Sequence, residues 1–383
     1  MSEVEQNTAT ALAGAKRIVL KIGSALLCGD AGNVRGGWLR TVAEDIAKLR
    51  MRGCEVIVVS SGAVALGRRL LKCEGSIRLE EKQACSAAGQ AALIRQWQHA
   101  LDAHDILAAQ VLLTLDDTEN RKRYLNARAA MRALLELGVL PVINENDTVA
   151  TSELRYGDND RLAAHAAQIV GADVLIMLSD VDGVYTGDPR RNGNATHLSV
   201  VDAFAAETAD FAAGPNQRAG VGSGGMASKI AAAKIASANG CVTIIASGLS
   251  EHPVRAILDG AAATLLPARG TAESARKQWI GGRISPAGII IIDNGAARAL
   301  QNGASLLPAG VIKVEGNFLR GDAVSVLNES GEEIAQGLVT YDTSDLSRIA
   351  GEKSEAIESI LGLRRRPAVI EKDDLVLRGI LKS

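Results

Sequence analysis

The chain has 383 residues, of which 47% are hydrophobic and 3% aromatic, so it is predicted to form two or three globular domains with aliphatic cores, and disorder is excluded. Lys and Arg number 42 and Asp and Glu 44, and this net charge of −2 favours neither nucleic acid nor an anionic membrane as a partner. The five cysteines are widely spaced, which predicts reduced thiols. The N-terminus lacks signal-peptide character, and no apolar run approaches the roughly 18 residues that cross a bilayer, so the sequence predicts a cytoplasmic protein.

Residues 15–267 alternate between apolar runs and Ala- and Leu-rich stretches of helical length. This alternation is typical of the α/β class, with an open, mostly parallel sheet between two layers of helices. The expected strands are 17–22, 55–59, 106–113, 139–143, 173–178 and 242–246, and the expected helices are 37–53, 80–104, 124–137, 160–170 and 226–239.

The pattern changes after Pro267, where residues 268–277 have the small and polar character of a linker. Residues 278–363 are predicted to form a small β-rich domain, folded as a barrel, and residues 364–383 a C-terminal extension. Its expected strands are 288–293, 310–315, 322–327 and 334–341.

Four strands of the first domain end in polar side chains. These side chains are Lys21, Ser60 with Ser61, Asp147, and Ser179 with Asp180. Ligands of an open parallel sheet bind outside the carboxyl ends of its strands, so the four strand ends predict one shared cleft.

A glycine-rich segment, residues 220–229, leads into the helix expected at 226–239 and carries Lys229 in its first turn. Glycine-rich loops at helix N-termini bind phosphate, although a flexible surface loop explains this segment alone equally well. Gly220, Gly222 and Gly225 fit G-x-G-x-x-G, but no strand precedes them directly and no acidic residue ends the next strand, which argues against a dinucleotide site.

Carboxylates and amides are concentrated between residues 144 and 160. Asp158, Asn159 and Asp160 are good caps for the helix that follows, but one cap needs only one such residue. The additional carboxylates and amides suit recognition of an amino group together with a carboxylate, or the holding of lysines in place. No histidine lies beside a strand-end group, so a Ser-His-Asp hydrolase is not expected.

Taken in order, these segments resemble the motifs of the amino-acid kinase family, and in particular its branch that phosphorylates glutamate. The matching segments are Lys21-Ile-Gly-Ser, Ser60-Ser-Gly-Ala, Val142-Ile-Asn-Glu-Asn-Asp, Gly157-Asp-Asn-Asp, Gly183-Val-Tyr-Thr-Gly-Asp-Pro and Ser223-Gly-Gly-Met-Ala-Ser-Lys. Residues 278–363 resemble the PUA domain. Ser179 and Ser223 stand where family members often have Thr, and both keep the hydroxyl group.

The resemblance implies a role for each matching residue. Lys21 and Lys229 would contact the phosphates as catalytic residues, with Asp160 orienting both. Ser61, Asp147 and Asn159 would bind the amino-acid substrate. The expected ATP-binding residues are Lys21, Ser179, Asp180, Ser223, Gly224, Gly225, Met226, Ala227, Ser228 and Lys229. No protein metal site is expected, because Mg²⁺ would be bound mainly by ATP oxygens.

The implied reaction transfers the γ-phosphoryl group of ATP to the side-chain carboxylate of L-glutamate, the first step of proline synthesis. A carboxylate acceptor is already ionised and needs no general base, so catalysis would consist of positioning and electrostatic stabilisation. The resemblance further implies feedback inhibition by proline and a homo-oligomer, a dimer or a tetramer, with glutamate-5-semialdehyde dehydrogenase as a candidate partner.

Two alternatives remain open from the sequence. Aspartate, acetylglutamate, carbamate or UMP could be the phosphoryl acceptor on the same fold. PUA domains also often contact RNA, but residues 276–383 carry 14 Lys and Arg against 14 Asp and Glu and lack the basic excess that phosphate binding favours. We therefore expect no nucleic acid partner, and a structural or regulatory role for this domain.

Overall fold

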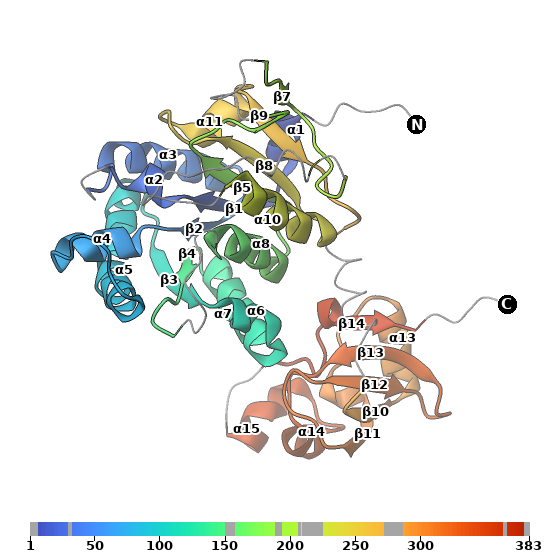
Figure 1. Cartoon of the computed structure of the whole chain (residues 1–383). Helices are drawn as coiled ribbons and strands as arrows, with labels where there is room; N and C mark the ends of the chain where they lie inside the picture. Colours follow the sequence, from blue (N-terminus) through green and yellow to red (C-terminus); the bar gives the residue numbers. More distant parts are fainter. Residues whose placement is uncertain are drawn as a thin grey trace. The chain divides into compact units, whose positions relative to one another are not determined.

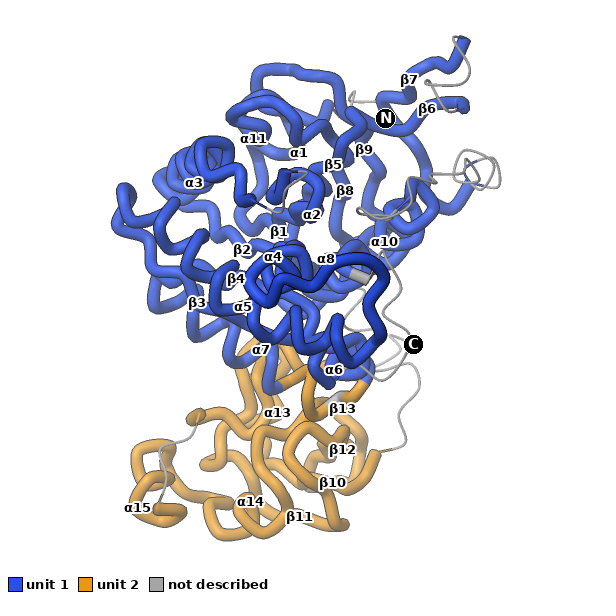
Figure 2. Tube along the Cα trace, turned by 60° about the vertical axis from the view of Figure 1, so that its left-hand side comes forward, with its two compact units in different colours: residues 1–119, 126–272 blue, residues 120–125, 273–383 orange. Residues whose placement is uncertain are grey.

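The computed structural model describes residues 7–29, 33–149, 158–187, 194–205, 208, 225–271, 286–362 and 366–378 (Figure 1). The chain divides into two compact units (Figure 2). Unit 1 contains residues 1–119 and 126–272, and unit 2 contains residues 120–125 and 273–383. The start of helix α7 (Arg121–Glu136) therefore belongs, by its contacts, to unit 2.

Unit 1 is built on a seven-stranded sheet with the order β3-β4-β2-β1-β5-β8-β9. The strands are β1 (Arg17–Ile22), β2 (Glu55–Ser60), β3 (Ala108–Leu113), β4 (Leu140–Glu145), β5 (Val174–Ser179), β8 (Val242–Ser247) and β9 (Ala263–Leu266). All neighbours are parallel except β9, which runs antiparallel to β8. The six expected strands are confirmed, whereas β9 was not expected. A short antiparallel hairpin, β6 (Val184–Tyr185) with β7 (His197–Leu198), follows β5.

Helices cover both faces of this sheet. On one face α1 (Thr8–Gly14), α3 (Gly36–Met51), α5 (Leu79–Leu101) and α11 (Pro253–Leu258) pack together. On the other face α8 (Asp158–Val170) packs against α10 (Met226–Ala238), and both contact the sheet (Figure 1). Helices α2 (Ser24–Leu27), α4 (Ala63–Leu70) and α6 (Leu115–Glu119) also belong to this unit, as does α7 from residue 126 onward.

The central strand β1 is buried on both faces. Ile18, Leu20 and Ile22 belong to the hydrophobic core that includes residues of α3 and α5. Because side chains alternate along a strand, Val19 and Lys21 point to the opposite face, which α8 covers. Because of this alternation, the side chain of Lys21 lies on the side of the sheet that carries α8 and α10.

Unit 2 contains a five-stranded mixed sheet with the order β11-β10-β12-β13-β14. Its elements are β10 (Gly288–Ile292), α13 (Asn294–Gln301), β11 (Val311–Gly316), β12 (Ala323–Leu327), β13 (Glu333–Leu338), α14 (Thr343–Ile349), α15 (Ile357–Leu361) and β14 (Leu375–Leu377). The four expected strands and the β-rich class are confirmed.

The C-terminal boundary of this sheet lies beyond the expected end of the domain at residue 363. Within the segment 364–383, taken from the sequence as an extension, β14 pairs with β13, and Val369, Ile370 and Leu375 join the core of unit 2. A strand of three residues gives too short a pattern to be recognised in advance.

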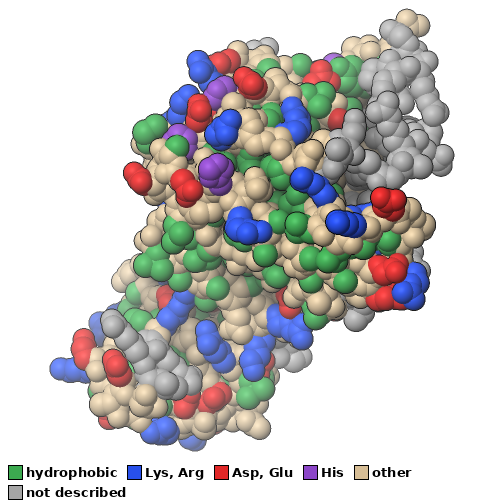
Figure 3. Space-filling view, turned by 90° about the vertical axis from the view of Figure 1, so that its left-hand side faces the viewer, with side chains coloured by type: hydrophobic (Ala, Val, Ile, Leu, Met, Phe, Trp, Pro, Cys, Tyr) green, Lys and Arg blue, Asp and Glu red, His purple; other side chains and the backbone are tan. Residues whose placement is uncertain are grey.

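The face of the chain drawn in Figure 3 agrees with its near-neutral composition. On the face that Figure 3 displays, basic and acidic side chains are both scattered among uncharged ones. Among the described residues, none of the helices combines the length and apolar character needed to span a membrane. All five cysteines are described, and each is a free thiol.

Candidate active site

Asp160, the third residue of α8, is at the centre of a buried charge cluster. Its side chain is fully buried, and Lys21 Nζ lies 2.5 Å from Oδ1 while Lys229 Nζ lies 3.3 Å from Oδ2. Ser228 Oγ donates a hydrogen bond of 2.6 Å to the same Oδ2. Lys21 and Lys229 are only 6% and 5% exposed, so two ammonium groups far apart in the sequence share one buried carboxylate.

Three elements bring these groups together. β1 delivers Lys21 from the centre of the sheet, α8 delivers Asp160 in its first turn, and α10 delivers Ser228 and Lys229 in its first turn. Gly225 is the N-cap residue of α10, with φ −64° and ψ 174°. The partial positive charge at the N-termini of the two helices adds to that of the lysines, and together they favour a bound anion such as phosphate.

The cluster sets the charge states of its members. Burial alone would raise the pKa of Asp160, but the charges of Lys21 and Lys229 outweigh it and lower the pKa to about 2. Burial lowers the pKa of Lys229, and repulsion from Lys21 adds to this while Asp160 opposes it. Asp160 is therefore a carboxylate at any physiological pH and attracts both ammonium groups.

Asn159 precedes Asp160 and connects α8 to two other strand ends. Its Nδ2 donates to Ser61 Oγ at 2.7 Å and to Asn144 Oδ1 at 3.2 Å. Its Oδ1 is buried and has no hydrogen-bond partner among the described residues. Buried polar atoms are nearly always paired, so this carbonyl oxygen is a candidate acceptor for a ligand's donor group.

Asp147 follows β4 and is almost fully buried. Ser86 Oγ, on α5, donates a hydrogen bond of 2.5 Å to Asp147 Oδ2. At the end of β5, Ser179 Oγ donates to Asp180 Oδ1 at 3.1 Å, with Ser179 buried and Asp180 exposed.

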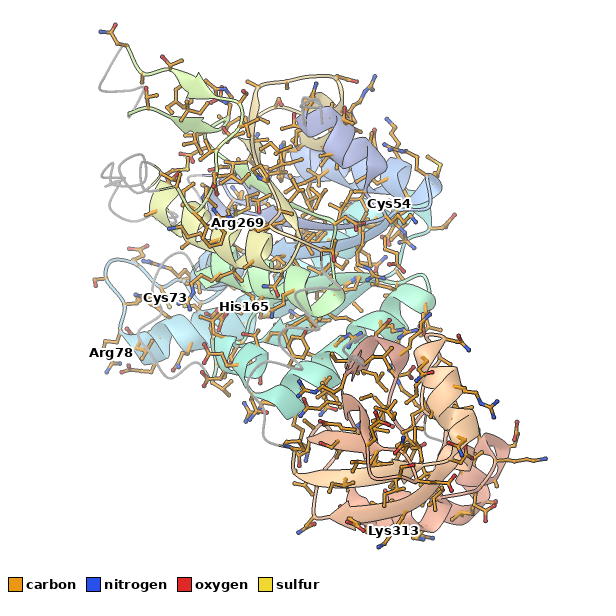
Figure 4. All side chains as sticks on the ribbon, turned by 90° about the vertical axis from the view of Figure 1, so that its right-hand side faces the viewer. Cys54, Cys73, Arg78, His165, Arg269 and Lys313 are labelled. Atoms are coloured by element: carbon orange, nitrogen blue, oxygen red, sulfur yellow. The ribbon has the colours of Figure 1, made fainter. Side chains whose placement is uncertain are left out.

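Helices α4 and α5 fix the position of Ser61 and of Ser86. A Cβ at Gly67 would lie 1.6 Å from the carbonyl oxygen of Cys85, and one at Gly89 would lie 1.8 Å from that of Ala63, so the two backbones are in direct contact. The turn between the helices carries Cys73 and Arg78 (Figure 4). At its end the backbone N–H of Arg78, the N-cap residue of α5, donates to Glu81 Oε2 at 2.7 Å.

The structure brings the expected site residues into several contacts. Lys21, Asp160 and Lys229 form one cluster, and Ser61 contacts Asn159. Met226, Ala227 and Ser228 begin α10, whereas Ser223 and Gly224 lie outside the described residues. Among the described residues, the His, Cys, Asp and Glu side chains form no group of three or more that could hold a metal ion.

Three contacts were not anticipated from the sequence. They are the hydrogen bond from Ser228 to Asp160, the one from Asn159 to Asn144, and the one from Ser86 to Asp147. Asn144 lies in the polar segment already singled out, and its position at the end of a buried strand is a usable signal. A serine inside a helix gives no such signal.

Residues 16–247, which carry every side chain of this cluster, match the model of the amino acid kinase family. The chain belongs to the amino acid kinase family. Residues 288–361 match the model of the PUA domain. The parallel sheet with helices on both faces and the separate β-rich unit agree with these two assignments.

Several named proteins are similar to this family member. A protein named glutamate 5-kinase from Caulobacter vibrioides is 54% identical over 369 residues, which cover 96% of this chain and 98% of that protein. Another glutamate 5-kinase, from Paramagnetospirillum magneticum, is 52% identical over 369 residues, with coverage of 96% and 99%. A crystal structure of UMP kinase from Ureaplasma parvum shares 17% identity with a TM-score of 0.48, covering 66% of this chain and 98% of that one.

Proposed function

We propose that this chain is a glutamate 5-kinase, which transfers the γ-phosphoryl group of ATP to the side-chain carboxylate of L-glutamate. In this reaction the bond between the γ-phosphorus and the β–γ bridging oxygen breaks and a new bond to a carboxylate oxygen forms, giving γ-glutamyl phosphate and ADP. Support comes from relatives of that name at more than 50% identity over nearly the whole chain.

The observation that carries the proposal is the sharing of Asp160 by Lys21 and Lys229. The reaction joins two anions, so its main obstacle is repulsion between the acceptor carboxylate and the phosphates. Two ammonium groups in a buried site offset this repulsion more strongly than they would in water. Asp160 holds both in place without donating or removing a proton.

In this proposal the two lysines share one task. Lys21 and Lys229 approach the γ-phosphoryl group from different elements and stabilise the charge that spreads over its oxygens. The N-terminus of α10, with Gly225 to Ser228 and the preceding Ser223 and Gly224, cradles the phosphates of ATP, and Ser179 and Asp180 hold the nucleotide. Mg²⁺, bound mainly by phosphate oxygens, would supply further charge neutralisation.

Glutamate would be held by Ser61, Asn159 and Asp147. Asp147 supplies a carboxylate for the ammonium group of the amino acid, and the buried Oδ1 of Asn159 supplies an acceptor. The acceptor carboxylate of glutamate is ionised at neutral pH, so the chemistry uses no general base. The cluster supplies none either, because a carboxylate with a pKa of about 2 is a very weak proton acceptor.

A hydroxamate assay tests the proposal. Full-length protein is incubated with ATP, Mg²⁺ and hydroxylamine together with L-glutamate, L-aspartate, N-acetyl-L-glutamate or UMP, and both ADP and trapped hydroxamate are measured. We expect both products with glutamate at a rate at least tenfold above those with the other acids. Preference for another acid would show that this acid is the substrate instead of glutamate. ADP formation with UMP and no trapped product would show that UMP is the substrate.

Regulation and assembly form a second part of the proposal. We propose inhibition by proline at or beside the glutamate pocket, a homo-oligomer, a cytoplasmic location and delivery of the labile product to glutamate-5-semialdehyde dehydrogenase. The kinase domain would span 15–267 and the PUA-like domain would begin after a linker at 268–277. Repeating the assay with proline, and measuring the molar mass by light scattering, tests the first two points.

A further inference from the structure

Helix α5 contacts the residues that end β4 through two buried side chains one turn apart. Ser86, which is 1% exposed, donates through Oγ to Asp147 Oδ2 at 2.5 Å. Gln90 donates through Nε2 to the backbone carbonyl oxygen of Glu145 at 3.3 Å, and its own Oε1 accepts a hydrogen bond of 2.8 Å from Gln110 Nε2. The segment 145–147 is therefore held from α5 as well as by its own strand.

The support behind Ser86 is rigid. The backbone contacts at Gly67 and Gly89 lock α5 against α4, and α4 begins directly after Ser61 and Gly62. Gly62 adopts φ +113°, a conformation that favours glycine, and is the N-cap residue of α4. One pair of helices thus fixes Ser61 directly and reaches Asp147 through Ser86.

We propose that Ser86 is a positioning residue that sets the affinity for glutamate. Its hydroxyl group donates to one oxygen of the Asp147 carboxylate and so fixes the rotation of that carboxylate, which directs it at the ammonium group of glutamate. Ser86 touches neither substrate. The inference rests on the proposed function, because it assigns Asp147 to the glutamate pocket.

The direct test compares Ser86→Ala and Ser86→Thr with the wild type, with all three as full-length proteins. We expect Ser86→Ala to raise the KM for glutamate about tenfold, as for the loss of a hydrogen bond to a charged group, while kcat and the KM for ATP stay within twofold. Ser86→Thr keeps the hydroxyl group and should restore the KM for glutamate.

Ser237→Ala is the matched control. Ser237 is also 1% exposed and lies in a helix, and its Oγ donates a 2.7 Å hydrogen bond to the carbonyl oxygen of Pro267, away from the charge cluster. Its loss should lower the melting temperature about as much as Ser86→Ala does and leave both KM values unchanged. A purely structural role for Ser86 would make the two variants alike in kinetics, which would overturn the inference.

A double-mutant cycle with Asp147→Ala separates the remaining outcomes. If Ser86 acts through Asp147, adding Ser86→Ala to Asp147→Ala should cause no further rise in the KM for glutamate. Additive effects would show that Ser86 acts by another route and would overturn the inference. Absence of glutamate phosphorylation by the wild type would instead contradict the proposed function.

Discussion

Lys229 is the lysine whose removal should affect the chemistry most and the fold least. In Lys229→Ala, Asp160 keeps the ion pair with Lys21, but the phosphoryl group loses one preorganised positive charge. We expect kcat to fall about 10²- to 10³-fold, as for the loss of one such donor. Steady-state kinetics measure the loss, and circular dichroism should show an unchanged fold. Lys234→Ala on the same helix is the control, and a variant of Lys229 with near wild-type kcat would remove this lysine from the mechanism.

Asp160 should stabilise the fold in a pH-dependent way. Its pKa of about 2 lies below the ordinary value of 3.8, so its ionised form contributes stability that is complete above about pH 4 and is lost as the pH falls toward 2. Asp160→Asn leaves two buried ammonium groups without their carboxylate and should cost about 3–5 kcal/mol of unfolding free energy at neutral pH.

Urea denaturation at several pH values checks this expectation. The difference between wild type and Asp160→Asn should be constant from pH 5 to 8 and shrink below pH 4. Asp202→Asn, which breaks the exposed ion pair with Arg269, is the control and should have a much smaller effect. A difference that grows as the pH falls would contradict the assigned charge state.

Lys21 and Asp160 were predictable from the sequence because each breaks a local rule. A lysine inside an aliphatic strand needs a counter-charge, and three polar residues in a row exceed the demand of one helix cap. Ser86 breaks no rule, because a small hydroxyl group fits a tightly packed helix interface whether or not it has a functional partner. Its contact with Asp147 depends on tertiary structure that no local pattern encodes.

Gly67 on α4 and Gly89 on α5, where the two backbones are in contact, should tolerate no larger residue. A methyl group at Gly89 would overlap the carbonyl oxygen of Ala63, and backbone cannot move aside as a flexible side chain can. We expect Gly89→Ala to lower the free energy of unfolding by more than about 2 kcal/mol, the range of overpacked cores. It should also raise the KM for glutamate, since Ser86 would shift with α5.

Gly37→Ala on α3 is the matched control for this change. Nothing lies within 4 Å of a Cβ at Gly37, and its φ is not positive, so the substitution should be neutral or stabilising by about 0.5–1 kcal/mol. Thermal unfolding of both variants measures the contrast. Equal stability of the two would show that the helices can separate without cost.

At the level of elements, long and doubly buried strands were predictable and short edge strands were not. β5 is an apolar run up to Ser179, and β1 is apolar apart from Arg17 and Lys21, because helices cover both faces of a parallel sheet. β9 and β14, of four and three residues, are held by pairing with longer strands, and their own patterns are too short to decide between strand and loop.

At the level of the whole molecule, the described charge cluster lies within unit 1 alone. A version of the chain that ends near residue 270 keeps Lys21, Asp160 and Lys229. We expect its kinetic constants to remain within about threefold of those of the full chain, by the usual independence of distant sites. Its melting temperature should fall, because Leu125 at the start of α7 loses its packing against Ala323 and Leu338. A folded but inactive version would mean that unit 2 takes part in catalysis.

The alternation of side chains along β1 makes catalysis sensitive to the register of Lys21 within that strand. Deleting one residue just before Lys21 would turn that ammonium group into the aliphatic layer beneath α3 and α5, with no carboxylate in reach. Inserting or removing residues in pairs would keep its orientation. An enzyme of this design can thus vary its N-terminal segment freely, provided that the six residues of its middle strand stay in phase with their neighbours.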